Sequence, residues 1–383
     1  MDGVRIYQSL EELPAHYGRL FKAASASSGV FLSLPWFRNL VQTAFAENKQ
    51  LRLYAIEPGT SESGALALLP MCYEQAARGR FAARHLSAAG NYYTSLFSPL
   101  VVNTDTGIRQ YLQALAKAIA FDAPHWDTVD LHPLQKETPL FGQLQQAFRE
   151  AGMAVQTYFC FGNWYLLVNG RSYEEYFNTL PSRLRNTVKR KARQLSDSGR
   201  LRLEIISDIT DIERGIAAYE KVYRASWKKP EPHPAFMPGL IRTAAEQGWL
   251  RLGIACIDGE PAAAQVWFVS NHVASIFKLA YDERFSRLSV GSVLTAHLMQ
   301  HVIDMDRVAE VDYLTGDDEY KQDWMSDRRE RWGILAFNLR TVNGAFAAMR
   351  HIGGGKLKSF ASRAMNTGPE QDRHLFRKAL SRE

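Results

Sequence analysis

The stretch LRLGIACIDGEPAAAQVWFV at residues 250–269 decides the fold. It holds two apolar runs, Leu250–Ile257 and Ala262–Val269, each of a length typical of strands. The dipeptide Asp258-Gly259 lies between them, and Asp-Gly between two apolar runs is typical of a tight turn. The stretch therefore predicts two strands joined by a short turn.

A second stretch of the same kind, LRLYAIEPGTSESGALALLP, occupies residues 51–70. In both halves a helix and a strand are expected to follow: 108–121 matches 292–304, and WDTVDL at 126–131 matches VAEVDYL at 308–314. The last match sets Asp130 opposite Asp312. The chain therefore predicts a tandem duplication of one mixed α/β unit of about 170 residues, a size that can bury its own core.

The turn signal Asn169-Gly170 predicts the boundary between the two units. We expect an N-terminal domain at 1–168, a C-terminal domain at 169–345 and a basic tail at 346–383. Apolar spacing predicts helices over Leu10–Ala24 and 172–197. Further along, a strand over Glu310–Leu314 and a helix over Asp318–Met325 are expected. The fold class is thus mixed α/β.

Composition and charge narrow the function. Apolar residues make up 46% of the 383 residues and charged residues 22%, which excludes a disordered chain or a fibre. Residues 350–383 carry a net charge of +5 of the total +6, so the body is almost neutral. A near-neutral body makes nucleic-acid binding by the whole protein less expected. The basic tail predicts weak contact with an anionic membrane surface.

The cysteines and histidines point away from disulfides and metals. The three cysteines are widely spaced without a Cys-x-x-Cys motif, which favours a reducing cytoplasm. His125, His132 and His233 lack metal-ligand spacing, so we expect no metal. The start of the chain has no signal-peptide pattern, and we expect no membrane span because no apolar run reaches about 18 residues.

Four motifs follow one another in the second half. They are Arg183-Leu-Arg-Asn, Ala225-Ser-Trp-Lys228, Leu279-Ala-Tyr-Asp282 followed by Leu288-Ser-Val-Gly291, and Asp312-x-x-x-Gly316-x-x-x-Tyr320-Lys321-x-x-Trp324. In this order they resemble the GNAT-superfamily acyltransferases of the cellulose-biosynthesis (CelD-type) group, relatives of the Fem-type peptidoglycan aminoacyltransferases. That family has two GNAT-like domains in tandem. The resemblance is strong over 170–340, weaker over 1–168, and does not cover 345–383.

The resemblance implies an acyl-CoA co-substrate, with acetyl-CoA as the expected form. Its pyrophosphate would lie on Ser289, Val290, Gly291 and Ser292, because a strand-to-helix turn aims free N–H groups at an anion. The usual Gln/Arg-x-x-Gly-x-Gly/Ala pattern is altered here, with Leu288 at its first position and Val293 at its last. The alternative is an ordinary helix cap, since Ser is favoured there.

Three residues are catalytic candidates. Asp312, near a strand end, would take a proton from an attacking amine, or would be a structural carboxylate that caps the next helix. The resemblance implies that Tyr320 and Lys321 line the active cleft, where Lys321 would neutralise a phosphate or an oxyanion. The alternative for Lys321 is a solvated surface lysine. Tyr320 and Trp324, four residues apart, are expected to share a core-facing side.

Substrate-binding candidates are Arg185, Lys228 and Tyr281. Arg185 belongs to a predicted helix at 183–193 that holds six basic residues and no acid. This helix is either an ordinary solvated helix or a contact for an anionic substrate, such as a sugar nucleotide or tRNA. Trp227 is expected to pack rather than to bind.

We therefore expect a cytoplasmic N-acyltransferase that moves an acyl group, with acetyl favoured, from acyl-CoA to an amine. By analogy the acceptor is a small molecule or a glycan precursor of the cell envelope or of an exopolysaccharide. Two alternatives stay open. One is Fem-type aminoacyl transfer from charged tRNA. The other is a non-catalytic scaffold of an envelope-polysaccharide assembly.

Overall fold

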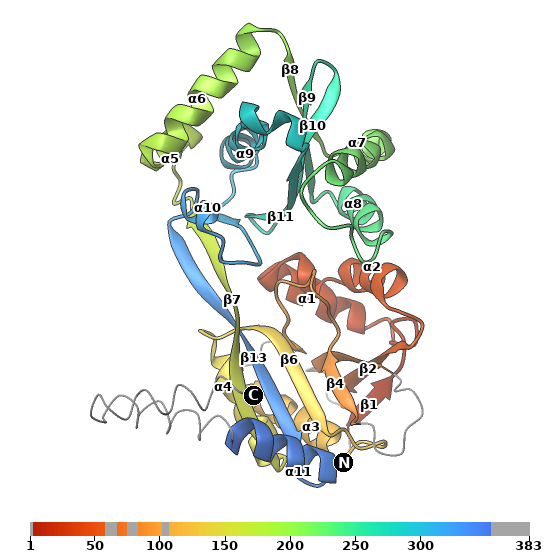
Figure 1. Cartoon of the computed structure of the whole chain (residues 1–383). Coiled ribbons are helices and arrows are strands. Elements are labelled where there is room, and N and C mark those ends of the chain that lie inside the picture. The colour runs from red at the N-terminus through yellow and green to blue at the C-terminus, as the bar shows by residue number, and fades with distance from the viewer. Residues whose placement is uncertain (1–2, 58–66, 75–82, 102–106, 354–383) are drawn as a thin grey trace, which may run out of the picture.

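The computed structural model describes residues 3–57, 67–74, 83–101 and 107–353, and Figure 1 shows their arrangement. Residues 59–64 (GTSESG), which the sequence predicts as the turn between the two apolar runs of 51–70, and most of the predicted tail lie outside these residues. The first half contains β1 (Val4–Tyr7), α1 (Tyr17–Ser28), a 3₁₀ turn (Val30–Leu32), α2 (Leu34–Ala44), β2 (Lys49–Ile56), β3 (Ala67–Glu74), β4 (His85–Ala88), β5 (Leu100–Val101), α3 (Ile108–Ala120), β6 (Thr128–Gln135) and α4 (Pro139–Glu150).

The long strand β7 (Met153–Leu167) leads into the second half. That half contains α5 (Tyr173–Thr179), α6 (Ser182–Asp197), β8 (Leu201–Ile206), α7 (Ile212–Arg224), α8 (Phe236–Glu246), β9 (Leu250–Ile257), β10 (Glu260–Ser270), β11 (Val273–Tyr281), α9 (Val290–Gln300), β12 (Glu310–Asp312) and α10 (Glu319–Gln322). A second long strand, β13 (Asp327–Asn338), returns to the first half and ends at α11 (Val342–Ala348).

All described strands belong to one mixed sheet. Its sequence of antiparallel and parallel neighbours is the same when followed inward from either edge. The order is β1-β2-β3-β4-β6-β13-β7-β12-β11-β10-β9-β8, with β5 beside β3. From each edge inward, three antiparallel steps lead to one parallel step, β4 with β6 or β11 with β12. The predicted tandem mixed α/β architecture is therefore confirmed.

The strand registers confirm the predicted match between the two halves at residue level. Asp130 of β6 pairs with Ser87 of β4, and Asp312 of β12 pairs with Ser275 of β11. Each aspartate is thus the third paired residue of the inner strand at the parallel step. The same backbone position is occupied by the same residue type in both copies.

The central pair β7 and β13 is shared between the halves. The C-terminal end of β7, Tyr165–Leu167, pairs with β12, whereas β13 pairs with β6 over residues 331–337. The two long strands also pair with each other along Met153–Tyr165. One sheet thus continues through both units, and the expected domain boundaries at 168/169 and 345/346 stay predictions.

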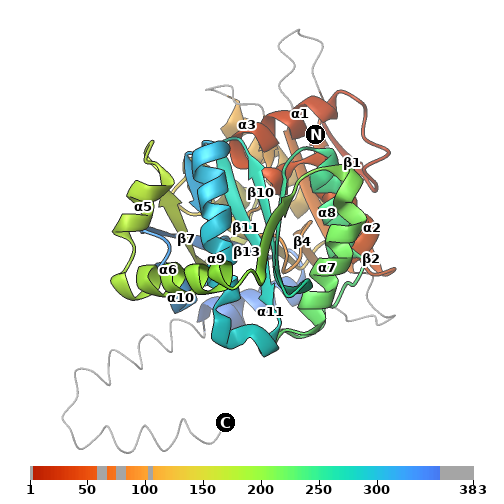
Figure 2. The ribbon, with the colours of Figure 1, turned by 90° about the horizontal axis from the view of Figure 1, so that it is seen from above.

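Helices cover both faces of the sheet. Figure 2 shows α9 and α6 on one side of β9–β11, and α7 with α8 on the other. The side of α7 and α8 also receives the first half, because Trp36 of α2 packs against Phe236 of α8 with ring centroids 5.7 Å apart. Asn39 of α2 donates a hydrogen bond to the Phe236 carbonyl. One apolar core therefore joins the halves behind the sheet.

Two predicted helices have different bounds in the structure. The helix expected over Leu10–Ala24 begins only at Tyr17, whose N–H bonds to the Pro14 carbonyl in a turn. The helix expected over 172–197 is divided into α5 and α6. Pro181 causes the break, because the residue before a proline is disfavoured in the helical region, and Leu180 is extended with ψ 154°.

Two elements near the predicted site are shorter than expected. The strand expected over Glu310–Leu314 ends at Asp312, because Leu314 adopts a left-handed conformation with φ 56°. The helix expected over Asp318–Met325 is a single turn, Glu319–Gln322. The segment between them is therefore a compact turn rather than a continuation of regular structure.

Candidate functional site

The candidate site lies where β11 and β12 separate. These parallel strands pair only over Val273–Ser275 and Glu310–Asp312 and then part. A cavity of about 250 Å³ occupies the gap, and we call it the lysine cavity. Three lysines and four tyrosines from both halves line it: Lys228, Lys278, Lys321, Tyr92, Tyr93, Tyr313 and Tyr320.

The equivalent gap in the first half is closed. There β4 and β6 also pair in parallel over three residues, His85–Ser87 with Thr128–Asp130. The loop after β4 then turns back onto β6, where the Phe97 N–H bonds to the Pro133 carbonyl at 2.7 Å. Phe97 is buried in the core. The duplicated fold therefore offers one open gap of this kind among the described residues, in the second half.

Lys321 is held inside the lysine cavity. Only 4% of the residue is exposed, so it is not the solvated surface lysine of the alternative interpretation. Its Nζ donates hydrogen bonds to the carbonyls of Thr315 (2.6 Å) and Gly316 (3.2 Å) and pairs with Asp318 at 3.1 Å. Burial lowers the pKa of Lys321, although Asp318 opposes this effect. The ammonium is thus fixed in direction.

The cavity wall carries a second perturbed lysine. Burial, reinforced by the nearby charge of Lys278, lowers the pKa of Lys228 to about 8. Lys278 itself is neutralised by Glu231, 2.8 Å away. Burial alone would raise the pKa of Glu231, but hydrogen bonds from Lys278 and two tyrosines outweigh it and lower the pKa to about 2. Lys228 is therefore the lysine of this wall without a carboxylate partner among the described residues.

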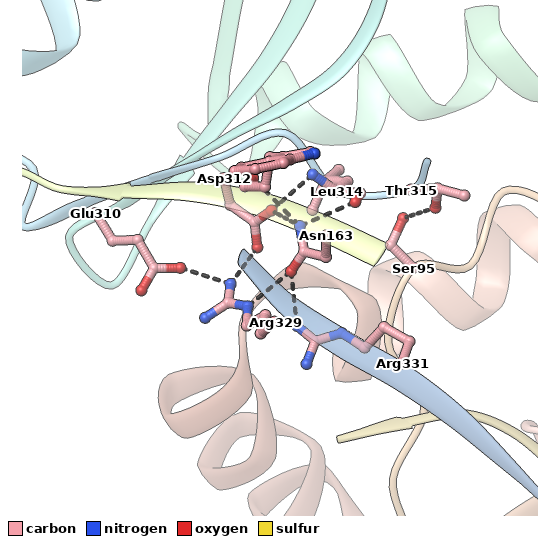
Figure 3. A network of polar contacts seen from close by, with 9 residues as sticks. Ser95, Asn163, Glu310, Asp312, Leu314, Thr315, Arg329 and Arg331 are labelled. Carbon is pink, nitrogen blue, oxygen red and sulfur yellow. Dashed lines mark hydrogen bonds and ion pairs between the residues drawn. The ribbon is translucent and has the colours of Figure 1, made fainter. Parts of the chain in front are cut away.

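Asp312 lies behind this cavity, in the polar network shown in Figure 3. Its Oδ1 accepts hydrogen bonds from Asn163 Nδ2 (2.5 Å) and the Leu314 N–H (2.6 Å). Its Oδ2 pairs with Arg329 Nη2 at 2.5 Å. The residue is buried and does not line the lysine cavity. Both carboxylate oxygens are thus engaged in structural contacts.

These contacts connect Asp312 to Lys321 through the backbone. The hydrogen bond from the Leu314 N–H to Asp312 stabilises the left-handed conformation at Leu314. The turn that follows presents the carbonyls of Thr315 and Gly316 to the Lys321 ammonium. Asp312 therefore shapes the turn that holds Lys321.

Tyr320 and Trp324 do not share one core-facing side as expected. Trp324 is buried, whereas Tyr320 is about half exposed at the rim of the lysine cavity. The Tyr320 ring packs edge-to-face on Tyr313 with centroids 5.9 Å apart. Because α10 is a single turn, four-residue spacing does not place both side chains on one buried face. This change leaves the Tyr320 hydroxyl available to the cavity.

The predicted pyrophosphate turn lies at the start of α9. Ser289 is left-handed (φ 53°), and its side chain makes no capping bond, so it is not the ordinary Ser cap of the alternative interpretation. The first N–H groups of a helix lack partners within it, which suits a phosphate at Val290–Ser292. A side chain at Gly291 would meet the Tyr281 ring at 3.3 Å. Tyr281 in turn packs on the half-exposed Trp227, with centroids 4.5 Å apart.

Arg185 and the basic helix lie elsewhere. Arg185 Nη1 bonds to the Asn178 carbonyl, and neither residue lines the lysine cavity. Lys189, Arg190 and Arg193 border a shallow hollow on α6. The structure thus brings together Lys228, Tyr320 and Lys321. It places Tyr281 with Ser289, Val290, Gly291 and Ser292 at a separate turn, and leaves Arg185 apart from both groups.

Several cavity residues were missed by sequence reasoning. Tyr92 and Tyr93 follow Gly90-Asn91, a dipeptide typical of a turn, and both donate hydrogen bonds to Glu231 in the second half. Tyr93 also stacks on Phe236 at 3.8 Å. A pair of aromatic residues directly after a turn signal is the one local feature that pointed there. Nothing local marks Lys278, which lies within an otherwise ordinary strand.

The described residues contain no candidate for a metal site and no candidate for a membrane-spanning helix. Within 3–57, 67–74, 83–101 and 107–353, we find no cluster of three or more metal-ligating side chains. In the same part of the chain, every helix is too short or too polar to span a bilayer.

Comparisons with known proteins concern the fold and part of the sequence. Residues 182–322 match the family model described as an acetyltransferase (GNAT) domain. Among solved structures, FemX gives a TM-score of 0.59 at 10% identity, covering 88% of this chain and 100% of FemX. A conserved protein of unknown function from Bacteroides thetaiotaomicron VPI-5482 gives 0.56 at 12% identity, covering 87% and 100%. A comparison with curated proteins finds no match. Residues 182–322 are therefore similar in sequence to a GNAT-type acetyltransferase domain, and 88% of this chain is similar in fold to FemX.

Proposed function

We propose that this protein is a cytoplasmic N-acyltransferase that transfers an acyl group, acetyl in the simplest case, from acyl-CoA to an amine. The observation that carries the proposal is the lysine cavity in the gap between β11 and β12. Strands that part in this way leave unpaired backbone groups and a hollow within the sheet, where a thioester can lie. The match of residues 182–322 to the GNAT acetyltransferase model supports the same chemistry.

The residues present fit a thioester with a pyrophosphate. The N–H groups at the start of α9 would hold the phosphates, helped by the positive end of the helix dipole. Small residues at 289, 291 and 292 keep side chains away from this turn. The acyl group would then extend along β11 into the lysine cavity. Bound acyl-CoA supplies an activated carbonyl, and the protein supplies position and charge.

Lys321 and Tyr320 would act on the carbonyl. An amine attacks the thioester carbon, the C–S bond breaks, and the amine's proton passes to the departing thiolate, so that an amide and a free thiol are formed. Lys321 would stabilise the negative charge that develops on the carbonyl oxygen by turning toward it the N–H group that pairs with the exposed Asp318, while the two backbone carbonyls hold the ammonium in place. Tyr320, a half-exposed residue that lines the same cavity, would donate its hydroxyl hydrogen to the same oxygen.

The charge of the cavity favours an acceptor that carries an anionic group. Lys278 and Lys321 have carboxylate partners, so Lys228 adds an uncompensated positive charge to the wall. A glycan precursor of the cell envelope or of an exopolysaccharide, commonly activated by phosphate, would meet this requirement. The second candidate function, aminoacyl transfer from charged tRNA, is favoured by the basic surface of α6.

A possible membrane contact would lie at the far end of the molecule from α6, at α11 (Figure 1). Val342, Phe346 and Met349 are exposed by 87%, 64% and 68%. Val342 and Phe346 lie four residues apart on one face of α11, and Met349 follows directly after the helix. The sequence from residue 350 onward has a net charge of +5. We propose that this apolar face and the basic segment together meet an anionic membrane surface.

Thermal unfolding with acetyl-CoA tests the enzymatic proposal. At a hundredfold excess over Kd the ligand should stabilise the fold by about 2.7 kcal/mol. Thiol release from acetyl-CoA, with glucosamine as the probe acceptor, measures transfer. Lys321→Met should retain acetyl-CoA binding but lose about 2.7–4 kcal/mol of barrier lowering, as on loss of one oxyanion donor.

The outcomes separate the candidate functions. If acetyl-CoA produces no stabilisation and no thiol is released, acetyl-CoA is excluded as the donor. Charged tRNA as the donor, or the scaffold role, then remains. Binding of tRNA that is lost in an Arg190→Glu, Arg193→Glu double variant would then favour the aminoacyl reading. Binding of acetyl-CoA without thiol release by wild type, across a panel of amine acceptors, would favour a non-catalytic protein.

A further inference from the structure

A second cavity lies on the other side of the turn after β12. It has a volume of about 260 Å³ and is lined mainly by polar side chains at the junction of the two halves. We call it the arginine cavity, after Arg329 and Arg331 of β13, which line it together with Gln135, Asn163 and Ser275. Figure 3 shows the two arginines extending from β13 toward Asn163.

The two arginines differ in how their charge is balanced. Arg329 pairs with Glu310 at 2.6 Å and with Asp312 at 2.5 Å, and its Nε donates to Asn163. Arg331 is only 4% exposed, yet among the described residues no carboxylate lies within ion-pair distance of it. Its Nη2 donates to Asn163 Oδ1 at 3.2 Å, an oxygen that Arg329 already uses.

Two nitrogen atoms of the Arg331 guanidinium have no partner in the described part of the chain. Nε and Nη1 are buried and have no hydrogen-bond partner among the described residues. The two carboxylates that line the cavity, Glu310 and Asp312, are both taken up by Arg329. Burial, reinforced by the charge of Arg329, lowers the pKa of Arg331. Because an unpaired buried charge is costly, a protein retains one mainly where a ligand completes it.

The arginine cavity adjoins the lysine cavity. Ser95 and Leu314 line both. A hydrogen bond of 2.8 Å between Ser95 Oγ and Thr315 Oγ1 joins the halves at this wall. One molecule passing Leu314 could therefore reach both cavities. A planar guanidinium recognises a carboxylate or a phosphate through two parallel hydrogen bonds.

We propose that the arginine cavity binds the anionic group, a carboxylate or a phosphate, of an acceptor whose amine reaches the lysine cavity. The identity of the ligand as acceptor rests on the proposed function, whereas anion binding at Arg331 does not. Arg331 is then a specificity residue at the end of the acceptor site opposite the reacting amine. Its unbalanced charge is a cost of the free protein that the bound anion offsets.

A pair of matched variants tests this assignment on the full-length protein. Arg331→Met removes the unpaired charge and should raise the Tm by roughly 1–4 °C. Arg329→Met removes the partner of Glu310 and Asp312 and should lower the Tm. A structural role for Arg331 predicts the opposite for the first variant, so a fall as large as that of Arg329→Met, or failure to fold, would overturn the proposal.

Anion binding supplies the second readout. Sodium acetate and sodium phosphate, each compared with sodium chloride at equal ionic strength, probe the carboxylate and the phosphate. At least one of them should raise the Tm of wild type, and Arg331→Met should abolish that rise. Equal shifts in both proteins would overturn the proposal. Anion binding that depends on Arg331, without thiol release from acetyl-CoA, would leave the anion site standing and remove the acyltransferase function.

Discussion

At the scale of single residues, the chemistry of this protein depends on how buried charges are matched. Lys321, Arg329 and Asp312 each have several partners, so their positions are fixed before any ligand arrives. Lys228 and Arg331 lack carboxylate partners among the described residues and line separate cavities. The charged residues that have partners within the protein therefore build the site. Those without a carboxylate partner are where an anion would bind.

The contacts of Asp312 lead to a prediction that separates positioning from proton transfer. Asp312→Asn keeps the shape but removes the charge that pairs with Arg329, so unfolding should require about 1–3 kcal/mol less free energy. Thiol release should fall, because the turn that holds Lys321 loosens, while the pH profile keeps its shape. A general base would give the reverse: unchanged stability, a loss of roughly 10²–10⁴ in rate and disappearance of the acid limb.

The lowered pKa of Lys228 predicts a pH-dependent affinity for anions. Its ammonium loses a proton around pH 8, so the cavity wall loses one positive charge as the pH rises from 7 to 9. Sulfate keeps a constant charge over this range, and its Kd for wild type should therefore increase. Isothermal titration at both pH values measures the change. Lys228→Met should bind sulfate weakly at pH 7 and show no further weakening at pH 9; an equal pH response would assign the titration to another group.

At the scale of elements, the loop after β4 brings the first half into the site. Tyr93 is 2% exposed and stacks on Phe236, whereas its neighbour Tyr92 is 53% exposed. Both hydroxyls bond to Glu231, so the two tyrosines differ mainly in burial. The docking of this loop depends on the buried ring.

This contrast gives a matched pair of variants. Tyr93→Ala should lower the free energy of unfolding by about 3–5 kcal/mol, the usual cost of removing a buried aromatic ring. Tyr92→Ala should cost at most about 1 kcal/mol, because its ring is largely solvated. Urea unfolding compares them. Similar losses in both variants would show that the hydrogen bonds to Glu231, rather than ring packing, hold the loop.

The elements also show where sequence reasoning succeeds. Strand and helix order, the tandem repeat and the correspondence of Asp130 with Asp312 follow from apolar periodicity, which is local. The break at Leu180-Pro181 was a local signal that the prediction passed over. The cavity walls combine Tyr93, Lys278 and Lys321, whose proximity is set by the twist and parting of the sheet. No spacing along the chain encodes that proximity, so the site was predicted only where a family motif marked it.

At the scale of the whole molecule, the basic segment and the apolar face of α11 predict membrane binding. Deleting residues 354–383 should leave the melting temperature unchanged and weaken co-sedimentation with vesicles of phosphatidylglycerol and phosphatidylcholine. The effect should fade at high salt, because charge interactions at a surface are screened. Binding to pure phosphatidylcholine should be weak throughout.

Variants of α11 separate the apolar contribution from the charge. Phe346→Glu with Met349→Glu should reduce vesicle binding, while Met305→Glu, a control of similar exposure in the segment after α9, should not. Sedimentation without lipid tests whether a second copy of the chain, rather than a membrane, covers this apolar face. A dimer that dissociates on the α11 double substitution, or loss of folded protein on deleting 354–383, would contradict the membrane assignment.

β7 pairs with β12 of the second half, and β13 pairs with β6 of the first half. This crossing of strands between the halves affects folding during synthesis. The strand that lies beside β6 in the first half is β13, which ends at Asn338. During synthesis, β6 and β7 therefore lack their common partner β13 until almost the entire described chain has left the ribosome. Exposed strand edges of this kind promote aggregation. A fragment of residues 1–168 should be insoluble when expressed alone, and co-expression with residues 169–383 should restore a soluble complex; a monomeric, folded 1–168 fragment would show that the first half completes its sheet without β13.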